Sequence, residues 1–66
     1  MYISVYDFCS LVENDERQII HLIDMDIERR MFSGKASEAQ KSKYAKYRVD
    51  SISASGYIIS LKIYKS

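Results

Sequence analysis

The chain has 66 residues but no proline, only two glycines, one histidine and one cysteine. A single cysteine, Cys9, excludes an internal disulfide, and with His21 it leaves too few soft ligands for a structural zinc site. Gly34 and Gly56 lie far apart, so there is no glycine-rich loop to cradle a phosphate. These scarcities predict a protein of a reducing compartment that holds no metal and no cofactor.

A long apolar run is also lacking. No stretch approaches the roughly 20 apolar residues that cross a bilayer, and residues 1–8 (MYISVYDF) have neither the basic region nor the apolar core of a signal peptide. We therefore expect residues 1–66 to form one small cytoplasmic domain without membrane contact. Because a domain of about 60 residues buries only about 60% of its unfolded surface, self-association is one way to stabilise it.

Charge is unevenly distributed along the chain. Residues 1–28 hold seven acids and one cation, a net charge of −6, whereas residues 29–66 hold nine cations and two acids, a net charge of +7. If folding kept the halves on separate faces, the molecule would be a strong dipole that steers charged partners. We expect folding to interleave them, because opposite charges brought together occur on most protein surfaces.

A short helix is predicted near the N-terminus. Ser4 is the expected N-cap, and Asp7 three residues later completes a capping box. Apolar side chains then recur with helical spacing in one stripe, at Val5, Phe8, Cys9 and Val12. A thiol on a buried stripe behaves as a small apolar group, so Cys9 is expected to be a core residue and not a nucleophile.

Strand patterns form two predicted hairpins separated by a helix. Residues 18–24 are apolar on both faces and favour a central strand, whereas residues 28–33 are polar and favour an edge. The second hairpin joins Val49 and Ile52 through a Ser-Ala-Ser-Gly turn to the alternating strand 57–64, whose one face is fully apolar. The expected strand order is second, first, fourth, third.

A second helix is predicted between the hairpins. Ser37 and Gln40 have capping-box spacing, and the helix is expected to run to about Lys46. The fold class is therefore α+β, with the order α-ββ-α-ββ. We expect a four-stranded sheet, β-grasp-like or all-antiparallel, with one or two helices packed on it.

A basic run, KSKYAKYR, follows the start of this predicted helix. Four cations alternate with tyrosines, a pattern that favours nucleic-acid binding through phosphate pairing and base stacking. On a helix, however, these cations do not line up, and the tyrosines share the more apolar face. Binding of nucleic acid is therefore the alternative function, carried by Lys41, Lys43, Lys46 and Arg48.

No catalytic set is apparent. His21 and Asp24 fall on opposite faces of one strand, and Cys9 belongs to another element, so spacing holds no nucleophile beside a base. The acidic turn from Asp24 to Glu28 lacks the glycine and the distal glutamate of a calcium loop. We therefore expect a protein that is not an enzyme.

Presentation of a surface to another protein is the favoured function. After the expected buried face is filled, several apolar, aromatic and charged side chains are left over, and these are the predicted anchors of a protein partner. A homodimer is the simplest version of this hypothesis. The predicted partner-binding residues are Tyr44, Tyr47, Ile58, Tyr64, Arg29 and Arg30.

Four segments, VYDFCSLV, IIHLIDMD, MFSGKASEA and YRVDSISASGYIISLKI, resemble a group of very small uncharacterised proteins of bacteriophages and mobile elements in low-GC Gram-positive bacteria. The resemblance covers nearly the whole chain, although that group is acidic and residues 29–66 here are basic. In size and context the chain is also similar to anti-CRISPR proteins. The resemblance implies a protein of the bacterial cytoplasm that binds a host protein, such as a CRISPR effector or another defence nuclease, and inhibits it.

Overall fold

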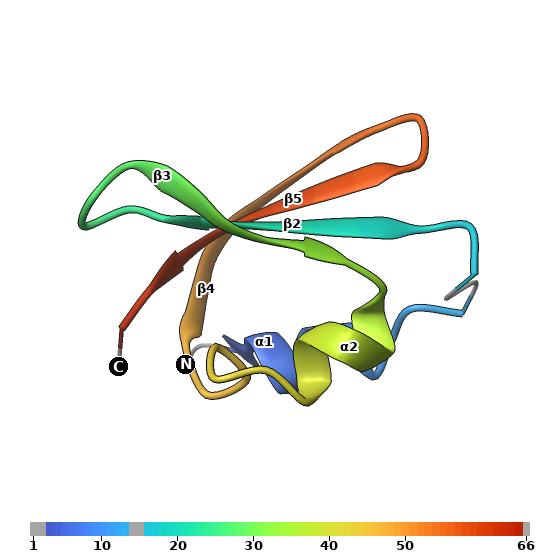
Figure 1. Cartoon of the computed structure of the whole chain (residues 1–66), viewed down its shortest axis with the longest axis horizontal. Coiled ribbons are helices and arrows are strands. Elements are labelled where there is room, and N and C mark those ends of the chain that lie inside the picture. The colour runs from blue at the N-terminus through green and yellow to red at the C-terminus, as the bar shows by residue number, and fades with distance from the viewer. Residues whose placement is uncertain (1–2, 14–15, 66) are drawn as a thin grey trace.

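The computed structural model describes residues 3–13 and 16–65. Five strands form one sheet, and two short helices lie together on one side of it, so the fold has two layers (Figure 1). In the described part of the chain, no helix covers the opposite face of the sheet (Figure 1). The elements are β1 (Ile3–Ser4), α1 (Val5–Cys9), β2 (Ile19–Asp24), β3 (Arg29–Gly34), α2 (Ala36–Gln40), β4 (Arg48–Ser55) and β5 (Ile58–Tyr64).

Helix α1 begins where the sequence predicts. The backbone N–H of Asp7 donates to Ser4 Oγ at 3.1 Å, which confirms Ser4 as the N-cap. The predicted stripe also faces the core, with Val5 and Cys9 buried and Phe8 partly buried against them. The helix ends after Cys9, so it covers little of the sheet.

Helix α2 is shorter than predicted. It begins after Lys35, whose N–H donates to Glu38 Oε1 at 3.0 Å, so the capping box expected at Ser37 and Gln40 is wrong. Both of those residues lie inside the helix.

The segment after α2 is a series of turns and not a helix that runs to Lys46. Ser42 Oγ donates to the carbonyl of Ala39 at 2.7 Å and accepts from the N–H of Tyr44 at 3.2 Å. A serine that bonds the neighbouring backbone in this way competes with helical hydrogen bonds. Ser42 is thus the physical reason that the helix stops at Gln40.

The sheet is mixed, with the order β1-β4-β5-β2-β3. Central strands β2 and β5 run parallel, and all the other pairs are antiparallel, so the all-antiparallel alternative is wrong. The segment between β3 and β4, which contains α2, is long enough to carry the chain back across the sheet. The second hairpin can therefore place β5 parallel to β2, which a tight turn would not allow. The order of the four longer strands is as predicted, but the count of four is wrong, because β1 adds a fifth strand beside Arg48 and Val49.

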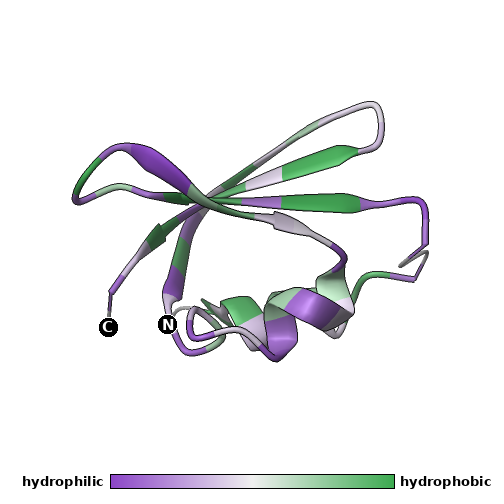
Figure 2. Ribbon diagram, in the orientation of Figure 1, coloured by the Kyte–Doolittle hydropathy of each residue, from purple (hydrophilic) through white to green (hydrophobic). Residues whose placement is uncertain are grey.

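The core lies between the sheet and the helices. Strands β2 and β5 supply its four largest fully buried side chains, Ile20, Leu22, Leu61 and Ile63. Their apolar residues are green in the middle of the sheet (Figure 2). Among the described residues, none of the helices has the length and apolar character needed to cross a bilayer.

The second hairpin turns later than predicted. Strand β4 continues through Ser55, and the turn consists of Gly56 and Tyr57, with Gly56 at φ +59°. Tyr57 was expected on the buried face of the last strand, but it lies in this turn and is 70% exposed. The positive φ that glycine adopts easily fixes the turn at position 56.

The two charged halves of the sequence are interleaved by the strand order. Strand β2, from the acidic half, lies between β3 and β5, which both come from the basic half. Arg29 on β3 is the register partner of Asp24 on β2. This arrangement favours the interleaved interpretation of the charges over the dipole.

Candidate protein-binding surface

The structure separates the predicted partner-binding residues into three regions. Tyr44 and Tyr47 lie in the turns after α2, where their rings pack edge to face with centroids 5.3 Å apart. Tyr44 is only 8% exposed and belongs to the core, and Tyr47 packs against the same core. These two tyrosines stabilise the domain and leave little surface for a partner.

Ile58 and Tyr64 lie on the face of the sheet opposite the helices, here called the open face. They occupy opposite ends of β5 and are both partly buried. Ile58 is the register partner of Ile19, and the guanidinium carbon of Arg48 lies 5.6 Å from the centre of the Tyr64 ring. These contacts hold both side chains against the sheet. Because Ile58 and Tyr64 lie at opposite ends of β5, they do not form one patch.

Arg29 and Arg30 lie at the beginning of β3, on the outer edge of the sheet, and are exposed. Their register partners on β2 are Asp24 and Ile23. Neighbouring strand residues point to opposite faces, so these two arginines are presented on different sides of the sheet. They do not form a single charged site.

The cations of the basic run are dispersed. The Lys43 ammonium lies 5.4 Å from the centre of the Tyr44 ring, and Lys46 lines a separate hollow beside Tyr6 and Asp7. Lys41 caps the end of α2. Because α2 ends at Gln40, before these cations, the helix does not align them along a nucleic-acid backbone.

The residues considered for catalysis are also apart. His21 lies on the open face between its register partners Ser33 and Ser60, whereas Cys9 is buried beneath the helix-covered face. Asp24 Oδ1 accepts a hydrogen bond from the N–H of Asp26 at 2.9 Å and so closes its own turn. Within residues 3–13 and 16–65, no three histidine, cysteine or acidic side chains gather closely enough to hold a metal ion.

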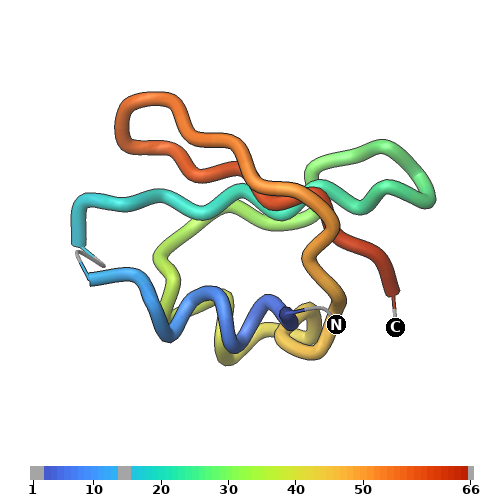
Figure 3. The backbone as a smooth tube through the Cα atoms, turned by 180° about the vertical axis from the view of Figure 1, so that it is seen from behind, coloured from blue at the N-terminus to red at the C-terminus, as the bar shows by residue number. Residues whose placement is uncertain are grey.

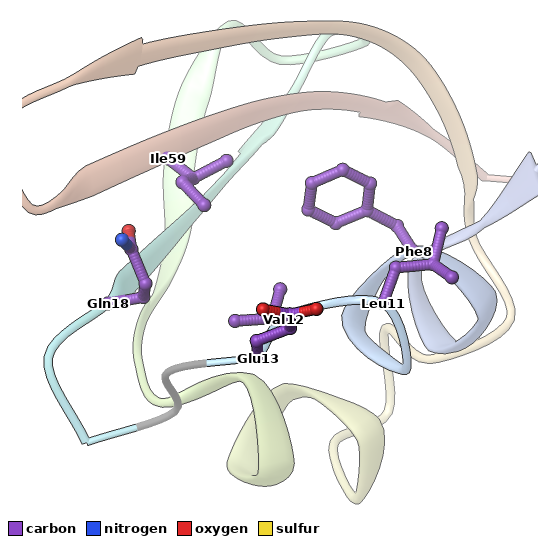
Figure 4. Close-up of a pocket in the computed structure, with 6 residues that line it drawn as sticks. All are labelled: Phe8, Leu11, Val12, Glu13, Gln18 and Ile59. Carbon is purple, nitrogen blue, oxygen red and sulfur yellow. The ribbon is translucent and has the colours of Figure 1, made fainter.

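A groove opens where helix coverage of the sheet ends. Helix α1 contacts β1 and β4, and α2 contacts β2 and β3, while the turn of the β4–β5 hairpin extends away from both helices (Figures 1 and 3). The space between α1 and the beginning of β5 is a groove of about 410 Å³. We call it the apolar groove, and it is lined by Phe8, Leu11, Val12, Glu13, Gln18 and Ile59 (Figure 4).

The lining of the apolar groove is mainly hydrophobic. Leu11, in the turn after α1, is 70% exposed, and Phe8, Val12 and Ile59 are only partly buried. On β4, Ala54 pairs with Ile59, and Ile52 pairs with Leu61 and is 52% exposed. Register partners share a face of the sheet, so the hydrophobic surface continues from the groove onto β4.

One polar atom in the apolar groove has no partner. Gln18 Oε1 is inaccessible to solvent and accepts no hydrogen bond. A buried acceptor without a donor costs about 1–3 kcal/mol, so rotation of the Gln18 side chain toward a ligand N–H or O–H in the groove would remove this cost. The apolar groove therefore combines hydrophobic walls with two polar side chains, Glu13 and Gln18.

Analysis of the sequence missed this groove because it depends on where α1 ends. Leu11 was the available signal, since it is a large apolar residue next to the helical stripe and not on it. Ile52 gave a second signal, because it sits in a stretch, Ser51–Ser55, that is otherwise small and polar. The chain matches no known family model, no curated protein and no solved structure.

Proposed function

We propose that this protein is a non-enzymatic protein-binding module that holds an apolar segment of its partner in the apolar groove. The observation that carries the proposal is the exposed hydrophobic surface formed by Leu11, the groove walls and Ile52. Contiguous apolar surface rimmed by polar residues is one mark of an interaction site. Covering Leu11 with a partner would remove apolar surface from water and so favour binding.

The shape and the chemistry of the groove favour a protein partner over a small substrate. Its walls come from α1, the turn after α1, and β5, and its hydrophobic surface runs on across β4. A partner side chain can fill the groove while neighbouring residues cover Ile52. Rotation of the Gln18 side chain toward the groove would supply a polar contact that fixes such a segment in one orientation.

The finer identity of the protein rests on the resemblance of its sequence to small phage proteins. We propose a β-grasp-like arrangement of the two hairpins around the parallel pair β2 and β5, carried by a phage or mobile element. The partner would then be a host protein, with inhibition of a defence nuclease as the version to test first. The proposal that the apolar groove binds a protein requires neither the phage origin nor the inhibition of a nuclease.

A pair of matched charge substitutions tests the groove. Leu11→Glu places a carboxylate at its mouth, and Ile27→Glu places one in the β2–β3 turn, where Ile27 is 50% exposed. Both parent residues are exposed, so both variants should unfold at the same denaturant concentration as the wild type. In affinity capture from host lysate, Leu11→Glu should lose a protein that wild type and Ile27→Glu retain. Equal capture by all three proteins would contradict the proposal.

A direct measurement complements the capture experiment. Once a captured protein is known, its addition to the isotope-labelled domain should shift the NMR signals of Phe8, Val12, Gln18 and Ile59. Shifts confined to the open face, at His21 and Ser60, would place the partner elsewhere and overturn the assignment of the groove.

A further inference from the structure

The two outer strands of the sheet are protected very differently. An edge strand presents unpaired backbone groups that can pair with another chain, and natural proteins guard such edges with charges, proline or bulges. Edge strand β3 carries Arg29 and Arg30, and its pairing with β2 is irregular at Ile23. Within residues 3–13 and 16–65, strand β4 is covered by β1 only at Arg48 and Val49.

On β4 the charge of Asp50 and the register shift between Val49 and Ser51 guard only the beginning of the strand, and Ser51–Ser55 has none of these devices. Residues Ser51–Ser55 (SISAS) contain no charge and no proline, and all five are exposed. Among the described residues, no strand pairs with this stretch on its outer side. Ile52 is 52% exposed although its register partner Leu61 is fully buried, so the helix-covered side of this edge is hydrophobic.

We propose that β4 pairs antiparallel with β4 of a second copy of this chain, about a twofold axis at Ser53. The sequence of the strand selects this occupant because SISAS is complementary to itself. In this register Ser53 faces Ser53 of the second copy, Ser51 faces Ser55, and Ile52 faces Ala54. A large side chain thus lies beside a small one on the helix-covered side, and hydroxyl groups pair on the open face.

Both ends of the stretch limit the pairing to these five residues. One position further, Asp50 would face Gly56, which lies in the turn and not in the strand. Beyond that, Tyr57 would face Val49 of the second copy, where β1 already occupies the edge. The pairing between the two copies therefore ends at the Gly56 turn on one side and at β1 on the other. Within this register no two like charges face each other.

The pairing accounts for the exposure of Ile52. It places Ile52 between Leu61 of its own sheet and Ala54 of the second copy, so the hydrophobic row is closed on both sides. The axis lies perpendicular to the sheet, so the helices of both copies cover the same face of one continuous sheet. Five residues of strand make a small interface, so the dimer is weak and forms at high protein concentration. In the dimer the second copy covers Ile52, so a partner of the apolar groove then contacts only Leu11 and the groove walls.

Sedimentation over about a hundredfold range of concentration tests the dimer. The mass of the wild type should rise toward that of two chains. Ile52→Lys puts a charge on the β4 edge and should stay monomeric, whereas Met31→Lys, on the β3 edge at a residue that is 38% exposed, should dimerise like the wild type. A wild type that stays monomeric, or an Ile52→Lys variant that still dimerises, would overturn the proposal.

Cross-linking tests the register. In the proposed dimer, Ser53→Cys brings two thiols face to face across the twofold axis, and oxidised glutathione should join the chains. Ser51→Cys is the matched control on the same strand, because its two thiols would lie about 13 Å apart, four strand residues from each other. Rapid cross-linking of Ser53→Cys alone is expected. Equal rates for both variants, or none for either, would contradict the register.

Discussion

Leu61 and Ile52 are register partners on neighbouring strands and share one face of the sheet, yet Leu61 is 0% exposed and Ile52 is 52% exposed. Both belong to strands with alternating side chains, so the strand pattern does not explain the difference. The helices do, because they lie near the beginning of β4, while its later part extends away from them with the β4–β5 turn (Figure 1). Burial in this small domain is therefore set by how far two five-residue helices reach across the sheet.

The largest expected effect is on the buried member of this pair. Leu61→Ala removes a fully buried side chain from the central strand and should lower the free energy of unfolding by about 2 to 5 kcal/mol, enough to unfold a marginal domain. Urea denaturation followed by circular dichroism measures the loss. If Leu61→Ala unfolds within about 1 kcal/mol of the wild type, β5 does not carry the core.

An intermediate effect is expected at the turn of the β4–β5 hairpin. Gly56 has φ +59° and open space around the position of a Cβ atom, so Gly56→Ala adds backbone strain without a steric clash. The strain should lower the free energy of unfolding by about 1 to 2 kcal/mol. Thermal denaturation measures it, with Ser55→Ala in the adjacent strand as the control. Equal stability of both variants would show that the turn relaxes.

Truncation of the exposed residue of the pair, Ile52, should hardly change the stability of the monomer. Ile52→Ala removes a half-exposed side chain, and at low protein concentration the free energy of unfolding should change by about 0.5 kcal/mol or less. The same urea denaturation as for Leu61→Ala compares the two positions directly. A loss as large as that of Leu61→Ala would mean that Ile52 is buried in solution, and its dependence on protein concentration would separate dimerisation from packing within one chain.

The smallest effect is expected for nucleic acid, which stays the alternative function. If the basic run does bind it, affinity should fall steeply with salt, and each of Lys41→Ala and Lys46→Ala should reduce that slope by about one unit. Fluorescence anisotropy with single- and double-stranded DNA and RNA at about 50 mM salt is the sensitive measurement. Because the structure disperses these cations, we expect no binding there, and tight binding would restore the alternative.

Local patterns predicted what depends on local interactions. The Ser4 cap, the apolar stripe of α1 and the two central strands all follow from residues within a few positions of one another, and the structure confirms them. Placing the most hydrophobic strands at the centre was also enough to predict the order of the four longer strands. Apolar residues on both sides of a strand were enough to indicate a central position, although only one of the two faces is covered by helices.

The errors arise where one side chain or a distant segment decides the structure. Ser42 ends α2 by bonding to backbone groups, although the surrounding residues favour a helix. Strand β1 has two residues, too few for any period to show, and it forms because Arg48 and Val49 offer an edge. The apolar groove depends on how much of the sheet the helices cover, and the residue pattern of a single helix or strand does not indicate this.

The parallel pair at the centre of the sheet also determines when the domain can fold. Ile19 on β2 pairs with Ile58 on β5, so the two strands that close the core are separated by most of the chain. Each hairpin forms from neighbouring residues, but neither buries its hydrophobic face alone. On the ribosome, β2 therefore waits with Ile20 and Leu22 uncovered until β5 has emerged. Folding of this domain therefore has to follow the synthesis of β5, and the uncovered strand β2 is its most vulnerable stage for chaperones and proteases.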